Sequence, residues 1–136
     1  MIVVLDTNVL LQSIGKKSRH RPIWQALLDK KYIAGVSSFI LLEYEEVIAI
    51  RASALASDLV QKIFLEAENI KHVNPDFEWD AISIDRDDNK FFDAAIAAGA
   101  DYLVTNDGHF NEAKKLSFPS VNIISSDEFL EILNSL

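Results

Sequence analysis

The sequence contains no cysteine and little glycine or proline, with four glycines and three prolines among 136 residues. Without cysteine the chain forms no disulfide and offers no thiolate to a metal. The scarcity of Gly and Pro, together with a hydrophobic fraction of 49%, excludes a low-complexity or disordered chain. A chain of this length fits one domain with one core, so we expect a single domain over residues 1–136.

Long apolar runs and an excess of positive charge are also missing. No run reaches the roughly 18 residues of a membrane span, and the first residues lack the basic start and cleavage site of a signal peptide. We therefore expect no membrane association and a cytoplasmic location. The chain has 13 Lys and Arg against 21 Asp and Glu, a formal net charge of −8. Such a protein binds polyanions poorly, so contact with nucleic acid would need a local basic patch or metal ions.

Apolar runs and helix signals alternate along the chain. Runs typical of buried strands lie at 2–5, 33–36, 102–105 and 121–124. Helices are expected directly after Asp6 and over 23–31, 38–51, 53–69, 88–98, 109–116 and from 125 onward. The apolar face of the helix at 53–69 is expected to consist of Leu55, Leu59, Ile63 and Ala67. This alternation predicts a three-layer α/β/α sandwich around a mostly parallel sheet of about four to five strands.

Four carboxylates occupy comparable places in this pattern. Asp6 ends the first strand, and Asp107 follows Thr105 at the end of another. Asp88 begins the helix that leads into that second strand. Glu43 lies about two turns into the helix after the strand at 33–36, beside an apolar stripe. Ligands of such folds bind outside the carboxyl ends of the strands, so we expect the four acids to lie near one another.

Each acid alone has a simpler explanation. Asp6 and Asp88 could cap the helices that follow them, and Asp107 could form a turn in Thr-Asn-Asp-Gly. Glu43 is harder to explain, because an acid beside an apolar stripe is uncommon. If the four converge, each close pair repels by roughly 4 kcal/mol at 4 Å and an effective dielectric of 20. The sequence supplies no evident Lys or Arg beside them, so such a cluster would protonate, spread apart or bind divalent cations, and all-oxygen ligands suit Mg²⁺ or Mn²⁺.

Four ordered motifs carry these acids. They are Leu5-Asp6-Thr7-Asn8-Val9-Leu10, Val36-Ser37 with Glu43 six residues after the serine, Asp85-Arg-Asp-Asp88-Asn89-Lys-Phe91, and Gly99-Ala-Asp101-Tyr-Leu-Val-Thr105-Asn-Asp107-Gly-His-Phe110. Together they resemble a PIN domain over almost the whole chain, above all the bacterial and archaeal single-domain PIN proteins of the VapC toxin type. The resemblance implies a Mg²⁺- or Mn²⁺-dependent endoribonuclease. It assigns catalysis and metal binding to Asp6, Glu43, Asp88 and Asp107, and a supporting role to Asn8, Ser37 and Thr105.

The resemblance also implies partners: an RNA substrate, a second copy of the chain in a homodimer, and a cognate antitoxin protein. A basic loop after the first helix is the one concentrated positive patch in the first part of the chain. Its charged residues are Lys16, Lys17, Arg19 and Arg21. These side chains could position RNA phosphates without specifying sequence, although a charge run is as often only a solvated surface.

The remaining acids and the histidines have weaker assignments. Asp85 and Asp87 are expected in a solvated loop, and Asp93 at the rim or in solvent, because it lies about 140° around the helix from Asp88. Any of the three could hold a second metal ion through water. The three histidines, His20, His72 and His109, are interpreted as non-catalytic. His109 is nevertheless expected near the site, because it follows Asp107 by two residues.

Three other classes of protein were compared with this pattern. A receiver domain would carry paired acids at the first strand and a lysine near the last, and the last strand here, Val-Asn-Ile-Ile-Ser-Ser, has none. A hydrolase of the haloacid dehalogenase type would begin Asp-x-Asp, where this chain has Asp6-Thr7-Asn8. The third alternative is a catalytically inactive PIN domain that binds RNA or protein. Such domains usually lack one or more of the acids, and all four are present here.

Overall fold

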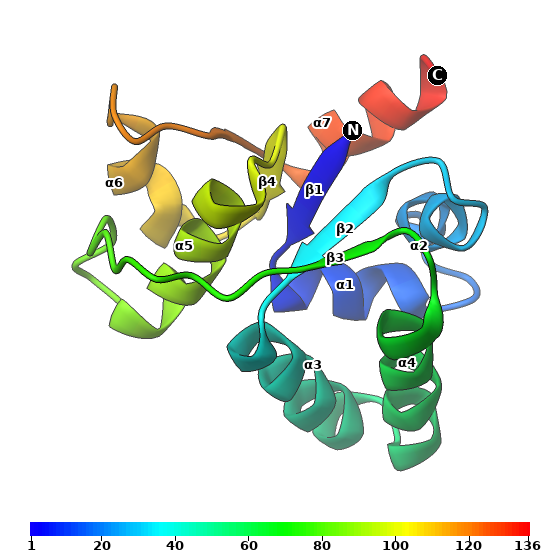
Figure 1. The fold of residues 1–136 in the computed structure, drawn as a ribbon. Coiled ribbons are helices and arrows are strands. Elements are labelled where there is room, and N and C mark those ends of the chain that lie inside the picture. Colours follow the sequence, from blue (N-terminus) through cyan, green and yellow to red (C-terminus); the bar gives the residue numbers. More distant parts are fainter.

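A computed structural model describes residues 1–136 and places the first apolar run in the middle of a sheet (Figure 1). The five strands are ordered β3-β2-β1-β4-β5. Their bounds are β1 Ile2–Leu5, β2 Ile33–Val36, β3 Ile70–His72, β4 Tyr102–Val104 and β5 Asn122–Ile124. All neighbouring strands pair in parallel. The predicted α/β class with a parallel sheet is therefore confirmed.

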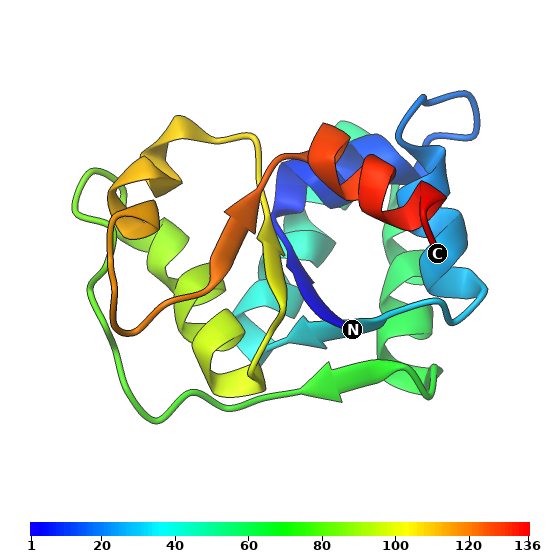
Figure 2. The ribbon, with the colours of Figure 1, turned by 90° about the horizontal axis from the view of Figure 1, so that it is seen from above.

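Seven α-helices and two short 3₁₀ turns cover the sheet. The helices are α1 Thr7–Ile14, α2 Arg21–Leu28, α3 Ser38–Arg51, α4 Ala54–Glu66, α5 Asn89–Ala98, α6 Asn111–Lys114 and α7 Ser126–Asn134. The turns are η1 Arg86–Asp88 and η2 Gly108–Phe110. Helix α5 lies against β1, β2 and β4, whereas α1, α2 and α7 pack together on the other side (Figure 2). The result is the predicted three-layer sandwich, and none of its helices has the length and apolar character needed to span a membrane.

Strand β1 is covered on both faces. Val3, Val4 and Leu5 are at most 1% exposed, as expected for a central strand of a parallel sheet with helices on both sides. On the next strand, a Cβ added to Gly35 would lie 3.2 Å from a side-chain atom of Val4 and 3.3 Å from the Cβ of Ala98. The glycine therefore permits close packing of β1, β2 and α5 in the core.

Serine side chains determine where two of the helices begin. Ser37 Oγ accepts a hydrogen bond from the Ile40 N–H (3.3 Å), so α3 begins directly after β2. Ser125 and Glu128 form both hydrogen bonds of a capping box at α7. Asp6 precedes α1 but makes no side-chain cap hydrogen bond. The capping explanation for Asp6 is therefore wrong, and its carboxylate is available for other contacts.

Helix α4 does not bury the predicted face. Leu55 and Leu59 are 70% and 58% exposed, whereas Ser57, Val60 and Phe64 are the buried positions. The helix packs mainly against α3, so it buries only one narrow side. Ile63 of the predicted face is half-buried against the core, whereas Leu55, Leu59 and Leu65 are left on the surface, which periodicity alone cannot distinguish from a buried face.

Strand β3 is absent from the strands that the sequence predicts. It has only three residues, Ile-Lys-His, and pairs on one side with β2. The segment is half-buried at Ile70 and exposed at Lys71 and His72. A strand this short at the edge of a sheet shows too little alternation to be recognised. Its hydrogen bonds to β2 define it instead.

Candidate active site

Two of the four acids are held together at the carboxyl edge of the sheet by one threonine. Asp6 follows β1, and Asp107 lies just beyond β4. Thr105 Oγ1 donates a hydrogen bond to Asp6 Oδ2 (2.7 Å) and accepts one from the backbone N–H of Asp107 (3.0 Å). Asp6 and Thr105 are 6% and 5% exposed. The hydroxyl therefore fixes the first acid and the segment that carries the second.

Glu43 reaches the same place from α3. The neighbouring Tyr44 hydroxyl donates to the Leu5 carbonyl oxygen (2.5 Å), which fastens α3 to the end of β1. Thr7 Oγ1, from the first residue of α1, donates to Glu43 Oε2. These two contacts place the Glu43 carboxylate beside the segment that contains Asp6.

Asp88 approaches from the opposite side, at the end of η1. It precedes α5 without making a side-chain cap hydrogen bond, so the capping explanation is wrong here as well. Its Oδ2 lies 3.3 Å from His109 Nδ1, which is 3.4 Å from Asp107 Oδ1. The prediction that His109 lies near the site is confirmed. Asp85, Asp88 and His109 place ligand atoms within 4.8 Å of one another. Asp85 therefore lies beside the acids, and the predicted position in a solvated loop describes it only in part.

The acids are near enough to perturb one another. Burial raises the pKa of Asp6, and the charges of Glu43 and Asp107 add to that rise. Burial, with the charges of Asp85 and Asp107, raises the pKa of Asp88 to about 6. Since neighbouring carboxylates contribute to both shifts, the four predicted acids surround one region of negative charge.

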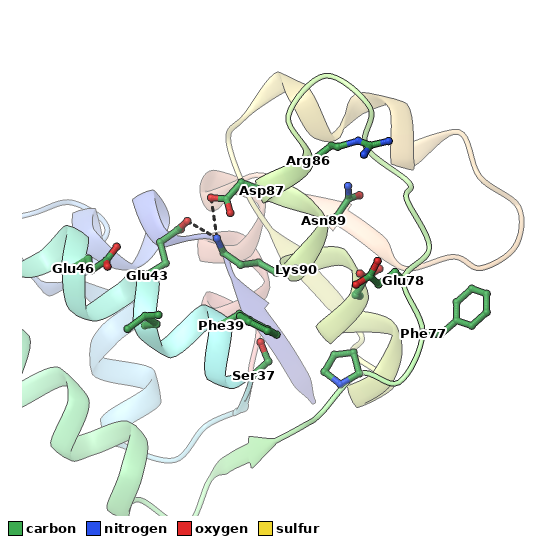
Figure 3. Close-up of a pocket in the computed structure, with 13 residues that line it drawn as sticks. Ser37, Phe39, Glu43, Glu46, Phe77, Glu78, Arg86, Asp87, Asn89 and Lys90 are labelled. Atoms are coloured by element: carbon green, nitrogen blue, oxygen red, sulfur yellow. Dashed lines mark ion pairs between the residues drawn. The ribbon is translucent and has the colours of Figure 1, made fainter.

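A lysine stands beside the acids, contrary to the expectation from the sequence. Lys90 Nζ lies 2.7 Å from Glu43 Oε1 and 2.9 Å from Asp87 Oδ2 (Figure 3). Burial lowers the pKa of Lys90, but hydrogen bonds and charges from Glu43 and Asp87 outweigh burial and raise it overall. Lys90 is therefore a cation at neutral pH. It is close to Asp88 in sequence, yet it meets Glu43 only because α5 packs beside α3.

The three expected supporting residues differ in what they contact. Thr105 binds Asp6, as described above. Ser37 acts at a distance, because its hydroxyl caps the helix that carries Glu43. Asn8 does not hydrogen-bond to any of the acids; it is exposed, and its Oδ1 accepts a long hydrogen bond (3.4 Å) from Arg51. Thr7, and not Asn8, contacts one of the acids, because its hydroxyl donates to Glu43. The two residues face different directions, since successive helical residues point about 100° apart.

Asp93 lines the cleft beside Glu43 and Lys90, but it is not the solvated acid that was the alternative prediction. It is 8% exposed, and its Oδ1 accepts a hydrogen bond from the Trp79 N–H (3.2 Å). Burial raises the pKa of Asp93. It therefore fastens the segment after β3 to α5. Asp87 is 73% exposed, as predicted, but it is paired with Lys90, whose hydrogen bond lowers the pKa of Asp87.

The basic loop lies between α1 and α2 and is partly committed to contacts within the protein. Arg19 pairs with Asp127 at the start of α7, and Arg21 donates to a backbone carbonyl of α1 (2.5 Å). Lys16 and Lys17 are exposed and make no ion pair. Two of the four predicted cations are therefore free for a ligand.

Polar contacts connect this loop to the acid centre. His20 Nε2 lies 3.1 Å from Ser126 Oγ. Asn106 Nδ2 donates to the same hydroxyl (2.9 Å), and its Oδ1 accepts from the Ser126 N–H (3.0 Å). Because Asn106 lies between Thr105 and Asp107, the basic loop and the acids share the carboxyl edge of the sheet. Sequence reasoning did not identify this connection, which depends on tertiary packing.

A cleft of about 450 Å³ opens beside Glu43 and Lys90 (Figure 3). The start of α3, the start of α5 and the segment after β3 form its walls. Phe39, Leu42 and Phe77 contribute apolar surface and are 69%, 57% and 60% exposed. The cleft is thus a mixed apolar and acidic surface that adjoins the acid centre on its Glu43 side.

Comparisons with known proteins agree with this geometry. A family model described as the PIN domain matches residues 2–109. VapBC2 from Rickettsia felis, bound to a promoter DNA fragment, has a similar structure, with a TM-score of 0.61, 21% identity and coverage of 92% of this chain and 98% of that chain. VapC20 from Mycobacterium tuberculosis, described as a sarcin-ricin loop cleaving toxin, has a TM-score of 0.60 and 19% identity. The match covers 82% of this chain and 94% of that chain. DNA-bound VapBC from Salmonella typhimurium has a TM-score of 0.59 and 17% identity, and the match covers 93% of this chain and 98% of that chain. The structural similarity shows a shared fold, and the search of curated proteins found no match.

Proposed function

This chain belongs to the PIN domain family, whose model matches residues 2–109, and we propose that it is a Mg²⁺- or Mn²⁺-dependent endoribonuclease of the VapC toxin type. The observation that carries the proposal is the convergence of four carboxylates at the carboxyl edge of the sheet. They are Asp6, Glu43, Asp88 and Asp107. A protein of the same fold that is described as a sarcin-ricin loop cleaving toxin supports this chemistry.

The donor set fits a hard divalent cation. Asp6, Asp88 and Asp107 offer carboxylate oxygens, and burial, together with the charges of neighbouring carboxylates, raises the pKa of Asp6 and of Asp88. Asp85 and His109 add one oxygen and one nitrogen within ligand spacing of Asp88. Mg²⁺ and Mn²⁺ are suited to a mainly oxygen set. Such a cation, when bound, supplies a water of lowered pKa and a counter-charge for the phosphate.

The protein itself would orient the reacting groups. Thr105 keeps Asp6 in one orientation, and Thr7 does the same for Glu43. Asp88 must lose its proton to act as a ligand, and its pKa of about 6 allows that at neutral pH. We propose that the phosphates of the RNA approach along the carboxyl edge, where Lys16 and Lys17 of the basic loop are exposed.

Two kinds of protein partner are proposed. The solved VapBC complexes have the same fold, which favours a cognate antitoxin. A homodimer of this chain is proposed on the family resemblance alone. Exposed apolar side chains of α3 and α4 offer surface for a protein partner: Ile50, Leu55, Leu59 and Leu65 are 83%, 70%, 58% and 66% exposed.

Residues 1–136 are proposed to form one PIN domain, because β5 completes the sheet beyond residue 109. A cytoplasmic location stays a prediction that follows from the proposed RNA substrate.

A second candidate function is an inactive PIN domain that binds RNA or protein. The observation that favours it is the ion pair between Lys90 and Glu43, since one of the four acids already has a cation partner. Metal binding separates the two candidates only in part, because an inactive domain can retain some ligands. RNA turnover separates them directly.

The test is cleavage of labelled single-stranded RNA by the purified chain with Mn²⁺ or Mg²⁺, beside Asp6→Asn and Asp88→Asn variants purified in the same way. We expect the wild type to cut, EDTA to stop the reaction, and both folded variants to fail. The variants control for a contaminating nuclease. Equal behaviour of all three proteins on several RNAs would exclude the proposed catalytic function.

A further inference from the structure

Lys90 and Glu43 form an ion pair that the proposed reaction does not require. Figure 3 shows Lys90 pointing from α5 toward α3, between Glu43 and Asp87. The side chains of Lys90 and Glu43 are 16% and 23% exposed, and their charged atoms are 2.7 Å apart. An exposed ion pair contributes little to stability, whereas removing one partner of a sheltered pair is costly because the other charge is left without compensation. The contact is therefore more than a screened surface pair.

Both oxygens of Glu43 have partners from the protein. Oε2 accepts the Thr7 hydroxyl, and Oε1 accepts the Lys90 ammonium. Lys90 is itself held by Asp87 and lies 5.6 Å from the centre of the Phe91 ring. The Glu43 carboxylate is thus oriented and neutralised without any metal.

The opposite side of the acid centre has no such cation. Asp88 and Asp107 contact His109, and Asp88 also lies near Asp85, another acid. No Lys or Arg forms an ion pair with either aspartate: Lys90 pairs with Glu43 and Asp87, and the other Lys and Arg ion pairs lie elsewhere on the protein. No lysine or arginine of the protein therefore balances the charge of Asp88 and Asp107.

We propose that Lys90 is a positioning residue that takes the place of a divalent cation on the Glu43 side of the acid centre. The inference rests on the proposed function and sharpens it, because it assigns the metal to the side of Asp88 and Asp107. A lysine ammonium is a compact point charge that competes with a metal ion for the same carboxylate oxygen. Lys90 therefore keeps Glu43 oriented and keeps it out of the inner ligand set.

Lys90→Met tests this inference, because methionine retains much of the apolar stem and removes the charge. Freed from Lys90, Glu43 becomes available to Mn²⁺, and we expect Mn²⁺ to bind about tenfold more tightly. RNA cleavage is expected to fall at the same time, since Glu43 loses its position. Lys90→Arg keeps the charge and should stay near the wild-type affinity. Isothermal titration with MnCl₂ alone, on the whole chain, measures the affinities.

A double-mutant cycle shows whether Lys90 acts through Glu43. In a Glu43→Gln background, Lys90→Met should no longer tighten Mn²⁺ binding, because the acid that it frees is absent. Equal tightening in both backgrounds would mean that Lys90 acts only by its general charge, and would overturn the inference. Lys62→Met is the matched control: it removes the same charge from an exposed position of α4, and it should leave the affinity unchanged.

The remaining outcomes are also decisive. If Lys90→Met is folded by circular dichroism and binds Mn²⁺ no more tightly than the wild type, the inference is wrong, although the proposed function can stand. If Lys90→Met does not fold, Glu43→Gln alone decides: it must weaken Mn²⁺ binding much less than Asp88→Asn, and an equal loss overturns the inference. If the wild type binds no Mn²⁺ at all, the proposed function fails, and this inference fails with it.

Discussion

The two sides of the acid centre differ in how their negative charge is balanced. On one side, Glu43 receives a hydroxyl from Thr7 and an ammonium from Lys90. On the other side, Asp88 and Asp107 lie beside the His109 ring but have no lysine or arginine partner. Asp107 Oδ1 also accepts the His109 backbone N–H (2.9 Å), and burial with the neighbouring acids raises the pKa of Asp88 to about 6. The first side is complete without a ligand, whereas the second is electrostatically unfavourable until a cation binds. A count of carboxylates alone would miss this difference.

The two sides of the acid centre should also differ in how they affect stability and function. Uncompensated acids cost folding free energy, and such costs are concentrated at functional sites. The ion pair between Lys90 and Glu43 lacks this cost, because each charge compensates the other. Substitutions on the two sides should therefore have different consequences, and these can be ranked by size.

The largest effect is expected from Asp107→Asn when it is compared with Glu43→Gln. Asp107→Asn should reduce RNA cleavage on the order of a hundred- to a thousandfold, because it removes charge from the uncompensated side. Glu43→Gln should cost roughly tenfold, since Lys90 and Thr7 already hold that position. Rates measured under single-turnover conditions check this, and circular dichroism confirms folding. Equal losses would remove the distinction between the two sides.

Thr105→Val should have the next largest effect. It removes the donor to Asp6 and the acceptor of the Asp107 N–H, both in a buried place, so the free energy of unfolding should fall by about 1–2 kcal/mol. Urea denaturation measures the loss, and RNA cleavage should fall with it. Thr105→Ser keeps the hydroxyl and is the control; a serine variant as damaged as the valine variant would point to the lost methyl group instead.

The metal-free protein should show a pH dependence that originates from Asp88. Its pKa is raised from 3.8 to about 6 in the folded chain, so between these pH values the folded state holds a proton that the unfolded chain has released. The contribution of Asp88 to the free energy of unfolding therefore falls as pH rises through that window. Allowing for partial solvent screening, the cost above pH 6 is about 1 kcal/mol.

Asp88→Asn should remove this slope. Urea denaturation in EDTA at about pH 4.5 and about pH 7 measures it, and the comparison of interest is the change between the two pH values in wild type and variant. The wild type should lose more stability than Asp88→Asn on going to the higher pH. Identical changes in the two proteins would show that Asp88 is not the uncompensated group.

The smallest effect is expected outside the acid centre, at the basic loop. Lys16→Ala combined with Lys17→Ala should raise the KM for RNA by roughly threefold, leave kcat unchanged and reduce the salt dependence of binding. Arg19 and Arg21 are already engaged within the protein, so their substitution should affect stability more than KM. A double lysine variant with wild-type KM and salt dependence would exclude the loop as a phosphate-binding surface.

Much of the fold and the general position of the site could be predicted from the sequence. The apolar run before Asp6 and the alternation of strands with helices indicate a parallel sheet, and the structure has one. In such a sheet the carboxyl ends of the strands meet at one edge. Asp6 and Asp107 were therefore expected near each other, and Thr105 joins them.

The rest depends on which helical neighbour points inward and on contacts between helices. Asn8 matches the motif, but α1 begins at Thr7, and it is Thr7 that faces Glu43. Lys90 follows Asp88 closely, yet no rule of spacing states that it crosses to Glu43 on another helix. A scan of the residues next to each acid for a basic side chain would have raised the question, although only packing answers it.

A crystal grown with MnCl₂ offers the most direct measurement of the difference between the two sides. Anomalous scattering at the manganese edge locates the ion without reference to activity. We expect one peak within coordination distance of Asp88 and Asp107, with the ion pair between Lys90 and Glu43 intact. A peak bound to Glu43, with Lys90 displaced, would contradict the assignment of the metal to the uncompensated side.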